Sequence, residues 1–194
     1  MYDFFQNFLK NGEYENAGVL VDVLRFHAPD DFDGSFEIPE KGVKAPDWER
    51  LYNLGINPYW ILETNRGKIE IRLDPLSAPF TVSSIDSLSR SGKYDGVPFH
   101  RVIANFVVQG GDFDRMDGFG GPAYRLPTEP SFVTFSRGSV GVASSGTDTE
   151  GSQFFITLNP TPHLDGFYTR FGEVVRGLDV ADRIQIGDRV IRAR

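Results

Sequence analysis

The chain has 194 residues, of which 40% are apolar, and a formal net charge of −7, values typical of a globular protein with one sizeable core. It contains no cysteine, which excludes a disulfide framework and thiolate chemistry. No apolar stretch approaches the roughly 18 residues of a membrane span, and the first residues lack the basic region and cleavage site of a signal peptide. The cytoplasm and a bacterial periplasm both remain open as compartments.

Negative charge is concentrated near the start of the chain. Residues 1–58 carry 11 acidic and 5 basic residues, whereas residues 59–194 carry 16 and 15. A nucleic-acid partner needs a basic patch, so the nearly neutral second part argues against one. The acidic part is most simply a solvated face, with docking to a basic partner as the alternative. The change predicts two parts: an extension over residues 1–58 and a domain over residues 59–194.

The extension is predicted to be partly helical. Apolar residues at positions 19, 20, 23, 24 and 26 predict an amphipathic helix over residues 17–26, and residues 2–9 could form another. Prolines and glycines in residues 27–47 indicate a linker. A last helical turn follows, with Asp47 as its N-cap. The apolar helix faces need a cover, which leaves open the following domain, a missing upstream domain or self-association.

Short strands dominate the predicted domain. Two strand-like runs predict a hairpin over residues 60–73. Pro79 and Gly92 suit the first turn and the C-terminal cap of a helix, and residues 177–186 predict a second helix. Further strands are predicted at residues 97–103, 106–109, 132–135, 139–143, 153–158, 168–175 and 189–193. Many short strands favour an antiparallel barrel, because closure removes exposed sheet edges.

Several common chemistries find no support in the sequence. Residues 112–118 resemble a calcium loop, but Met116 occupies a ligand slot and Ala123 stands where a glutamate is needed, so these acids are expected to cap a turn. The three histidines lack metal-ligand spacing. Neither a G-x-S-x-G nucleophile elbow nor a phosphate-binding glycine loop occurs. We therefore predict no metal, no cofactor and no covalent nucleophile.

The stretch FHRVIANFVVQGGDF, residues 99–113, places a histidine and an arginine before an apolar run, which a buried strand does not need. It resembles the signature of cyclophilins, the peptidyl-prolyl cis–trans isomerases. Residues 138–157 and 163–184 resemble two further signatures of that family, in the family's order. The resemblance covers about residues 60–194. It implies a mainly β fold, a closed eight-stranded antiparallel barrel capped by two helices, here with a partly helical N-terminal extension.

The implied reaction explains the residue types. Rotation about an X-Pro bond faces a barrier of ~18–20 kcal/mol, and no covalent bond breaks. Twisting the bond localises a lone pair on the prolyl nitrogen, to which a guanidinium can donate better than in the planar ground state. One charge-assisted hydrogen bond contributes ~1.5–3 kcal/mol, whereas a 10⁵-fold acceleration needs about 7 kcal/mol. Apolar surface must therefore hold the proline ring as well.

The resemblance implies a role for each matched residue. Arg101 would be the electrostatic catalyst, Gln109 would orient it and bind the substrate backbone, and His100 would lie at the pocket floor, as a structural residue or a catalytic aid. Phe106 would act with them and line the proline pocket together with Val107, Phe155 and Leu164. The subsite for the residue before proline would be bordered by Ala143, Ser144 and Gln153. The rim would carry His163 and Tyr168.

Three rim positions depart from residues common in eukaryotic members: His163 replaces a tryptophan, Tyr168 a histidine and Ser144 an asparagine. These departures are typical of bacterial members and are expected to weaken cyclosporin binding more than catalysis. The alternative to an enzyme is a proline-peptide binding or chaperone-like module with incidental catalysis. The presence of Arg101 and Gln109 favours the enzyme. Expected partners are proline-containing peptides or unfolded protein segments.

Overall fold

A computed structural model describes residues 41–194 of the chain. The helices expected over residues 2–9 and 17–26 lie outside the described residues. Residues Gly42–Arg194 form one compact unit, so the described end of the expected extension packs with the sheet. An independent role for residues 1–58 stays a prediction. Within residues 41–194, every helix is too short or too polar to cross a membrane.

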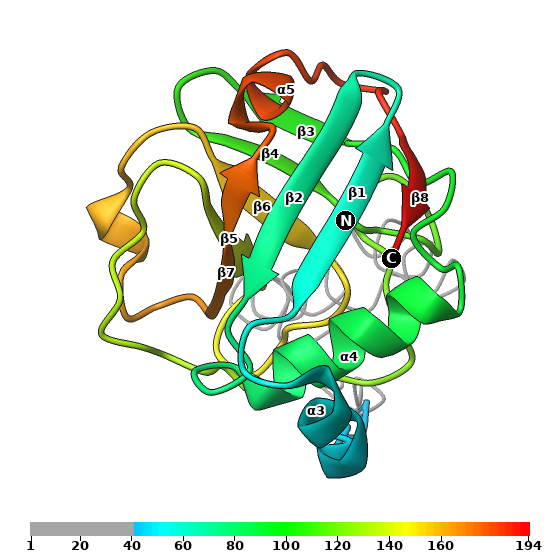
Figure 1. Cartoon of the computed structure of the whole chain (residues 1–194), viewed down its shortest axis with the longest axis vertical. Helices are drawn as coiled ribbons and strands as arrows, with labels where there is room; N and C mark the ends of the chain where they lie inside the picture. The colour runs from blue at the N-terminus through cyan, green and yellow to red at the C-terminus, as the bar shows by residue number, and fades with distance from the viewer. Residues whose placement is uncertain (1–40) are drawn as a thin grey trace, which may run out of the picture. The chain divides into compact units, whose positions relative to one another are not determined.

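A curled antiparallel sheet of eight strands forms the centre of the described structure (Figure 1). The strands are β1 (Tyr59–Thr64), β2 (Gly67–Leu73), β3 (Arg101–Ile103), β4 (Val107–Gly110), β5 (Ser139–Val142), β6 (Phe154–Thr157), β7 (Arg170–Arg176) and β8 (Val190–Ala193). Their order in the sheet is β3-β4-β6-β5-β7-β2-β1-β8. The mainly β, antiparallel architecture expected from the sequence is confirmed.

The predicted hairpin is formed by β1 and β2. Thr64 pairs with Gly67 across a two-residue turn, and Gly67 adopts a φ of 135°, which favours glycine. Along β2 the side chains of Ile69 and Ile71 are buried while Arg72 is exposed. This alternation follows from the two-residue period of a strand that has one face on the core.

The prediction of a closed barrel is wrong, because the strand ladder is open between its first and last strands. Strands β3 and β8 are the two edges of the sheet and do not pair with each other. The chain just before β3 comes near β8 instead, where the Phe99 amide donates to the Asp188 carbonyl (2.7 Å) and the Val190 amide donates to the Val97 carbonyl (2.9 Å). Pro98 and Arg189 form an isolated antiparallel bridge between these two bonds, so the gap is crossed by a short bridge and not by a regular ladder of β3 with β8.

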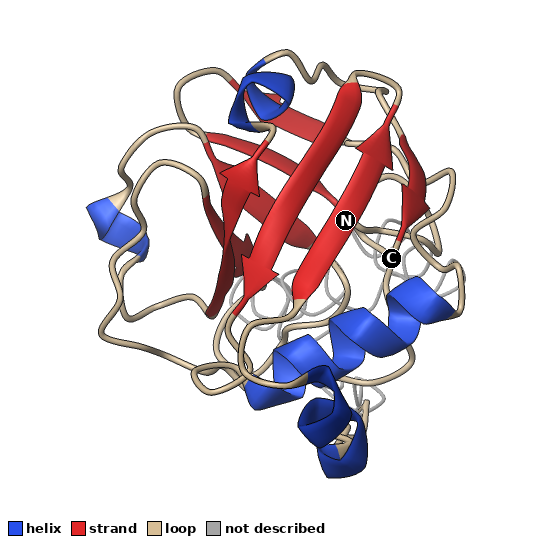
Figure 2. Ribbon diagram, viewed as in Figure 1, coloured by secondary structure: helices blue, strands red, loops and turns tan. Residues whose placement is uncertain are grey.

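Helices α4 (Pro79–Arg90) and α5 (Leu178–Asp182) lie at opposite ends of the curled sheet (Figure 2). Pro79 begins α4, as expected, while α5 is shorter than predicted and ends at Asp182. A further helix, α3 (Trp48–Leu54), precedes the sheet, and the Asp47 carboxylate accepts a hydrogen bond from the Arg50 amide, which confirms the predicted N-cap. A single 3₁₀ turn, η1 (Pro162–Leu164), follows β6.

The strand predicted at residues 132–135 is wrong. This segment bonds to loops: the Phe135 amide donates to the Asp165 carboxylate, and the Phe135 carbonyl accepts from the Thr161 amide at 2.8 Å. Phe132 is fully exposed and Phe135 is buried. The apolar run therefore reflects one side chain that fills a pocket rather than a strand face.

Aromatic rings fill the concave side of the sheet. Trp60 lies edge-on to Tyr94 and Phe154, with ring centroids 5.3 and 4.9 Å apart. Phe99 and Phe171 are also fully buried in this cluster. Because side chains occupy the interior, a binding site is expected on the outer surface.

Candidate active site

A cavity of ≈ 150 Å³ opens on the outer face of the sheet. Its lining comes from β3, β4, β6, the segment after β5 and the segment around η1. The lining residues are Arg101, Phe106, Val107, Gln109, Ala143, Ser144, Phe155, Leu164 and Tyr168. All nine were named from the sequence, so the structure brings together most of the predicted site, while His100, Gln153 and His163 lie outside this lining.

Strand register explains how these side chains reach one face. Arg101 pairs with Gln109, and Gln109 pairs with Phe155 on the next strand. Their neighbours Val108 and Phe154 point the other way and belong to the interior core. The two-residue period thus gives the same strands a core side and a cavity side.

A directed chain of hydrogen bonds holds the Arg101 side chain. Arg101 Nη1 donates to Gln109 Oε1 (3.0 Å), and Gln109 Nε2 donates to Gln153 Oε1 (3.1 Å). Gln153 Nε2 in turn donates to the carbonyls of Gly118 and Gly120, at 2.8 and 2.9 Å. Those carbonyls fix the orientation of the Gln153 amide, so the Gln109 oxygen must face Arg101. Gln153 therefore acts behind the cavity wall.

The Arg101 guanidinium is exposed and lies beside an aromatic pair. Its central carbon is 5.8 Å from the centroid of the Phe106 ring, within the distance of a cation–π contact. The Phe106 ring also stacks on the ring of His163, with the two ring centroids 5.5 Å apart. His163 thus supports a cavity residue from outside.

The apolar half of the cavity is a packed cluster of its own. Phe155 stacks on Phe135 at 5.6 Å and meets Tyr168 edge-on at 5.9 Å. Leu164 and Val107 complete this buried cluster. A methyl group at Gly141 would come within 2.5 Å of the Phe155 ring, so glycine is needed there. The result is a firm apolar floor next to a cation.

His100 lies under the loop that follows β4. Its ring is close enough to Gly118 that an added Cβ there would come within 2.9 Å of it. Neither ring nitrogen has a hydrogen-bond partner among the described residues. Burial lowers the pKa of the imidazole, which favours the neutral ring.

The sequence analysis missed the part that Asp112 plays in this site. The Asp112 carboxylate is buried and accepts from the backbone N–H groups of residues 114, 115, 117, 118 and 120. These hydrogen bonds hold its pKa below the usual range, against the opposing effect of burial. Asp112 thereby fixes the two carbonyls that orient Gln153. The turn cap expected at residues 112–118 is thus confirmed; its link to Arg101 needs the three-dimensional structure.

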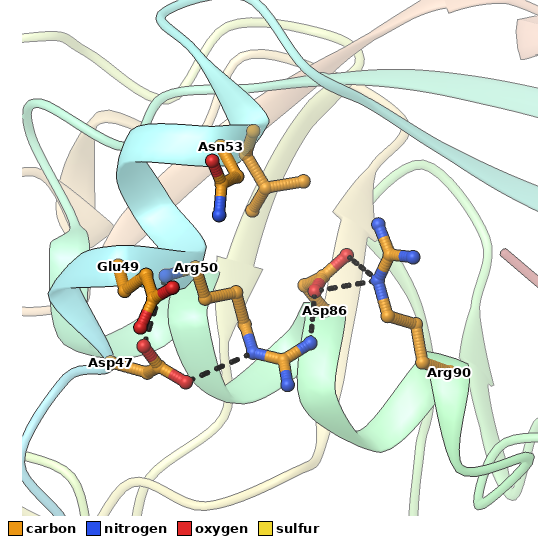
Figure 3. A pocket seen from close by; sticks show the side chains of 7 residues that line it. Asp47, Glu49, Arg50, Asn53, Asp86 and Arg90 are labelled. Carbon is orange, nitrogen blue, oxygen red and sulfur yellow. Dashed lines mark hydrogen bonds and ion pairs between the residues drawn. The ribbon is translucent and has the colours of Figure 1, made fainter.

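No group of three or more potential metal-binding side chains occurs among residues 41–194. A larger cavity of ≈ 360 Å³ lies between α3 and α4, on a different part of the surface (Figure 3). There Asp86 bonds to both Arg50 (2.8 Å) and Arg90 (2.9 Å), and Asp47 caps α3. Asp86 thus pairs with arginines from both helices, so we interpret this cavity as a junction between α3 and α4.

Comparison with known proteins places the chain in a family. The model for "Cyclophilin type peptidyl-prolyl cis-trans isomerase/CLD" matches residues 59–192. Peptidyl-prolyl cis-trans isomerase B of Bacillus subtilis is 46% identical over 132 residues, covering 67% of this chain and 91% of that protein. A peptidyl-prolyl cis-trans isomerase of Synechococcus elongatus is 41% identical over 136 residues, covering 69% and 93%.

Solved structures agree with this assignment. A cyclophilin-type isomerase of Cryptosporidium parvum superposes with a TM-score of 0.67 at 27% identity, covering 71% of this chain and 96% of that one. A second structure of that protein, in the presence of the dipeptide Ala-Pro, has a TM-score of 0.66. The chain belongs to the cyclophilin-type peptidyl-prolyl cis–trans isomerase family. It is an isomerase that accelerates the exchange of X-Pro bonds in protein substrates.

Proposed function

We propose that Arg101 is the electrostatic catalyst of this isomerase. The observation that carries the proposal is an exposed guanidinium beside the apolar floor of the cavity, with one side-chain hydrogen bond within residues 41–194, to Gln109. A guanidinium has five N–H donors, so donors remain for a substrate. One of them donates to the prolyl nitrogen as the peptide bond twists and the lone pair localises.

The proline ring binds on the apolar floor. Phe106, Val107, Phe155 and Leu164 offer rings and methyl groups that bury it away from water, which holds one side of the rotating bond still. The residue before proline lies against Ala143 and Ser144, and Tyr168 and His163 border the groove. The apolar floor binds the proline ring, and the Arg101 guanidinium stabilises the twisted X-Pro bond.

Gln109 and Gln153 orient the catalyst. The hydrogen bonds described above leave Arg101 one preferred direction, which lowers the entropy cost of reaching the transition state. His100 is a structural neighbour of this chain of hydrogen bonds, because its neutral ring supports the loop at Gly118. The substrates are proline-containing segments of peptides and unfolded proteins. The related structure with Ala-Pro supports this substrate class.

The test is an exchange assay on an Ala-Pro peptide, followed by NMR at equilibrium, with wild type, Arg101→Ala and Arg101→Lys. Loss of one charge-assisted hydrogen bond of about 1.5–3 kcal/mol lowers turnover roughly 10- to 100-fold. Lysine keeps the charge but lacks the planar fork, so it restores only part of the activity. Arg176→Ala, which removes an exposed arginine elsewhere, is the control. Unchanged turnover in Arg101→Ala contradicts the proposal.

A further inference from the structure

A glutamate is fully buried behind the groove. Glu150 has no exposed surface, and it follows the segment that carries Ala143 and Ser144. Both of its carboxyl oxygens contact the Thr169 hydroxyl, with Oγ1 2.9 Å from Oε1 and 2.8 Å from Oε2. Thr169 comes directly after Tyr168, which lines the cavity. One carboxyl group therefore joins two segments that form the groove.

The hydrogen-bond inventory at this contact favours a neutral acid. Thr169 Oγ1 already accepts from the Glu129 amide at 2.7 Å, so it keeps one lone pair and one proton. In an ionised Glu150, both carboxylate oxygens compete for the one hydroxyl proton of Thr169. The other donor to this carboxylate is the Thr169 amide, at a long distance of 3.4 Å. A protonated Glu150 can donate its own proton to the free lone pair. Protonation thus adds a hydrogen bond to the link.

The charged surroundings act in the same direction. Burial is the largest effect on the pKa of Glu150 and raises it, the Thr169 hydrogen bonds lower it, and the nearby carboxylates of Glu129 and Asp148 raise it further. The net result is a pKa of about 7. Two arginines lie on the elements packed against it, but Arg170 bonds to residues on β5 and β7, and Arg125 is partly exposed. A buried carboxylate at this position is therefore costly.

We propose that Glu150 is a positioning residue for the substrate groove, which in its protonated form holds Thr169 and Tyr168 in the geometry that binds peptide. Ionisation removes a hydrogen bond from the link and weakens peptide binding. The Thr169 carbonyl also accepts from the Val142 amide at 3.0 Å, so a shift of Thr169 reaches the segment before Ala143. The proposal rests on the proposed site, and it concerns binding rather than the twisting step.

The experiment measures the Kd and the exchange rate of an Ala-Pro peptide on the full chain by NMR. The pH runs from about 6 to about 8.5, across the region in which this carboxyl group titrates. In wild type we expect the Kd to rise roughly threefold or more, while the rate at saturation stays constant because Arg101 remains charged. Glu150→Gln, which stays neutral, should keep the low-pH Kd throughout. Glu49→Gln, an exposed acid on α3, should behave as wild type.

Each alternative outcome overturns the proposal. If the wild-type Kd does not change with pH, Glu150 has no effect on peptide binding. If the Kd of Glu150→Gln still changes with pH, another group is responsible. Should Glu150→Gln fail to fold, the carboxyl carbon of Glu150 can be titrated by NMR in wild type. Binding and protonation are reciprocal, so saturating peptide must then raise its pKa; no change overturns the proposal.

Arg101→Ala separates this inference from the proposed function. If both hold, exchange in this variant is reduced at every pH and the Kd keeps its dependence on pH. If Arg101 is not the catalyst, exchange survives in the variant while the Kd titration stays informative. The exchange rate therefore tests the role of Arg101, and the pH dependence of the Kd tests the role of Glu150.

Discussion

The two cavities differ in how their charged groups are satisfied. Between α3 and α4, the larger cavity contains Asp86 bonded to two arginines, and Asp47 bonded to the start of its helix (Figure 3). The smaller cavity contains Arg101, whose side chain bonds to Gln109 and otherwise faces solvent and aromatic rings. Volume alone would select the cavity between the helices and not the proposed site.

The proposed reactive surface differs from a structural junction in its unused hydrogen-bond donors. A matched ion pair has its donors and acceptors occupied, so a ligand must break a contact before it gains one. A guanidinium with free donors beside apolar surface gains both a hydrogen bond and burial when a peptide arrives. Glu150 extends the comparison, because it is a buried carboxyl group without a matching cation among the contacts that hold it.

The sharpest test of this contrast replaces one arginine from each cavity, Arg101 and Arg50, by alanine. Arg101→Ala should lower turnover roughly 100-fold, which corresponds to about 2.7 kcal/mol, while thermal stability changes little because the side chain is exposed. Arg50→Ala should do the reverse: it removes the ion pairs of α3 with Asp86 and Asp47 and lowers stability by about 1 kcal/mol, with turnover within about twofold of wild type. Turnover in the assay above and melting temperature are the readouts. A large loss of turnover in Arg50→Ala would show that the junction serves catalysis.

The unmatched carboxyl group predicts a pH dependence of stability. Glu150 titrates near 4.5 when unfolded and at about 7 in the folded chain, so the folded state binds the proton more tightly. Its stabilising contribution is complete below pH 4.5 and is lost as the pH rises through about 7, for a total of about 3 kcal/mol. Glu150→Gln should lack this loss and be more stable than wild type at about pH 8. Urea denaturation at several pH values measures it.

Glu173→Gln provides the contrast for that measurement. Glu173 is bonded to Arg72 and Arg170 on the outer part of the sheet. Its replacement removes the ion pairs with these two arginines and should lower stability at about pH 8, the opposite direction from Glu150→Gln. If both variants shift stability in the same direction at about pH 8, the distinction between matched and unmatched carboxyl groups is wrong.

A smaller effect is expected where the orienting chain of hydrogen bonds is broken. Gln153→Leu removes the acceptor of Gln109 Nε2 and leaves the carbonyls of Gly118 and Gly120 without their donor. With Gln109 free to rotate, Arg101 loses its fixed direction, and we expect turnover to fall roughly tenfold, about 1.4 kcal/mol. The loss should appear in the rate at saturation more than in the Kd. Gln153→Glu keeps the acceptor for Gln109 but not the donors, so it should separate the two halves of the chain.

Local sequence patterns predicted much of the fold. The hairpin, the start of α4 at Pro79 and the cap at Asp47 depend on neighbouring residues, and all three are confirmed. The strand at residues 132–135 and the closed barrel were wrong for non-local reasons. Phe135 owes its burial to the cavity cluster, and the gap between β3 and β8 is crossed by a bridge between residues 97–99 and 188–190, which are distant in the sequence.

The site shows the same division. Residues of matched motifs, such as Arg101 and Phe155, could be named from the sequence because the motifs carry them together. Two other features depend on how the loop over residues 112–120 folds back. One is the position of Gln153 behind Gln109, and the other is the way Asp112 holds the loop whose carbonyls bind Gln153. The contact of Glu150 with Thr169 joins residues 19 positions apart and has no local signal.

The smallest predicted effect concerns the cap of α3. Asp47→Ala removes the hydrogen bond from the Arg50 amide to the Asp47 carboxylate, and typical N-cap losses are about 1 kcal/mol. For a domain of this size the melting temperature should fall by roughly 2–4 °C. Asp47→Asn keeps the acceptor and should lose only a few tenths of a kcal/mol. Peptide turnover should stay the same in both variants, because the groove is built from other elements. If turnover falls in step with stability in Asp47→Ala but not in Asp47→Asn, the α3–α4 junction and the groove are coupled, and the division between a structural and a reactive cavity does not hold.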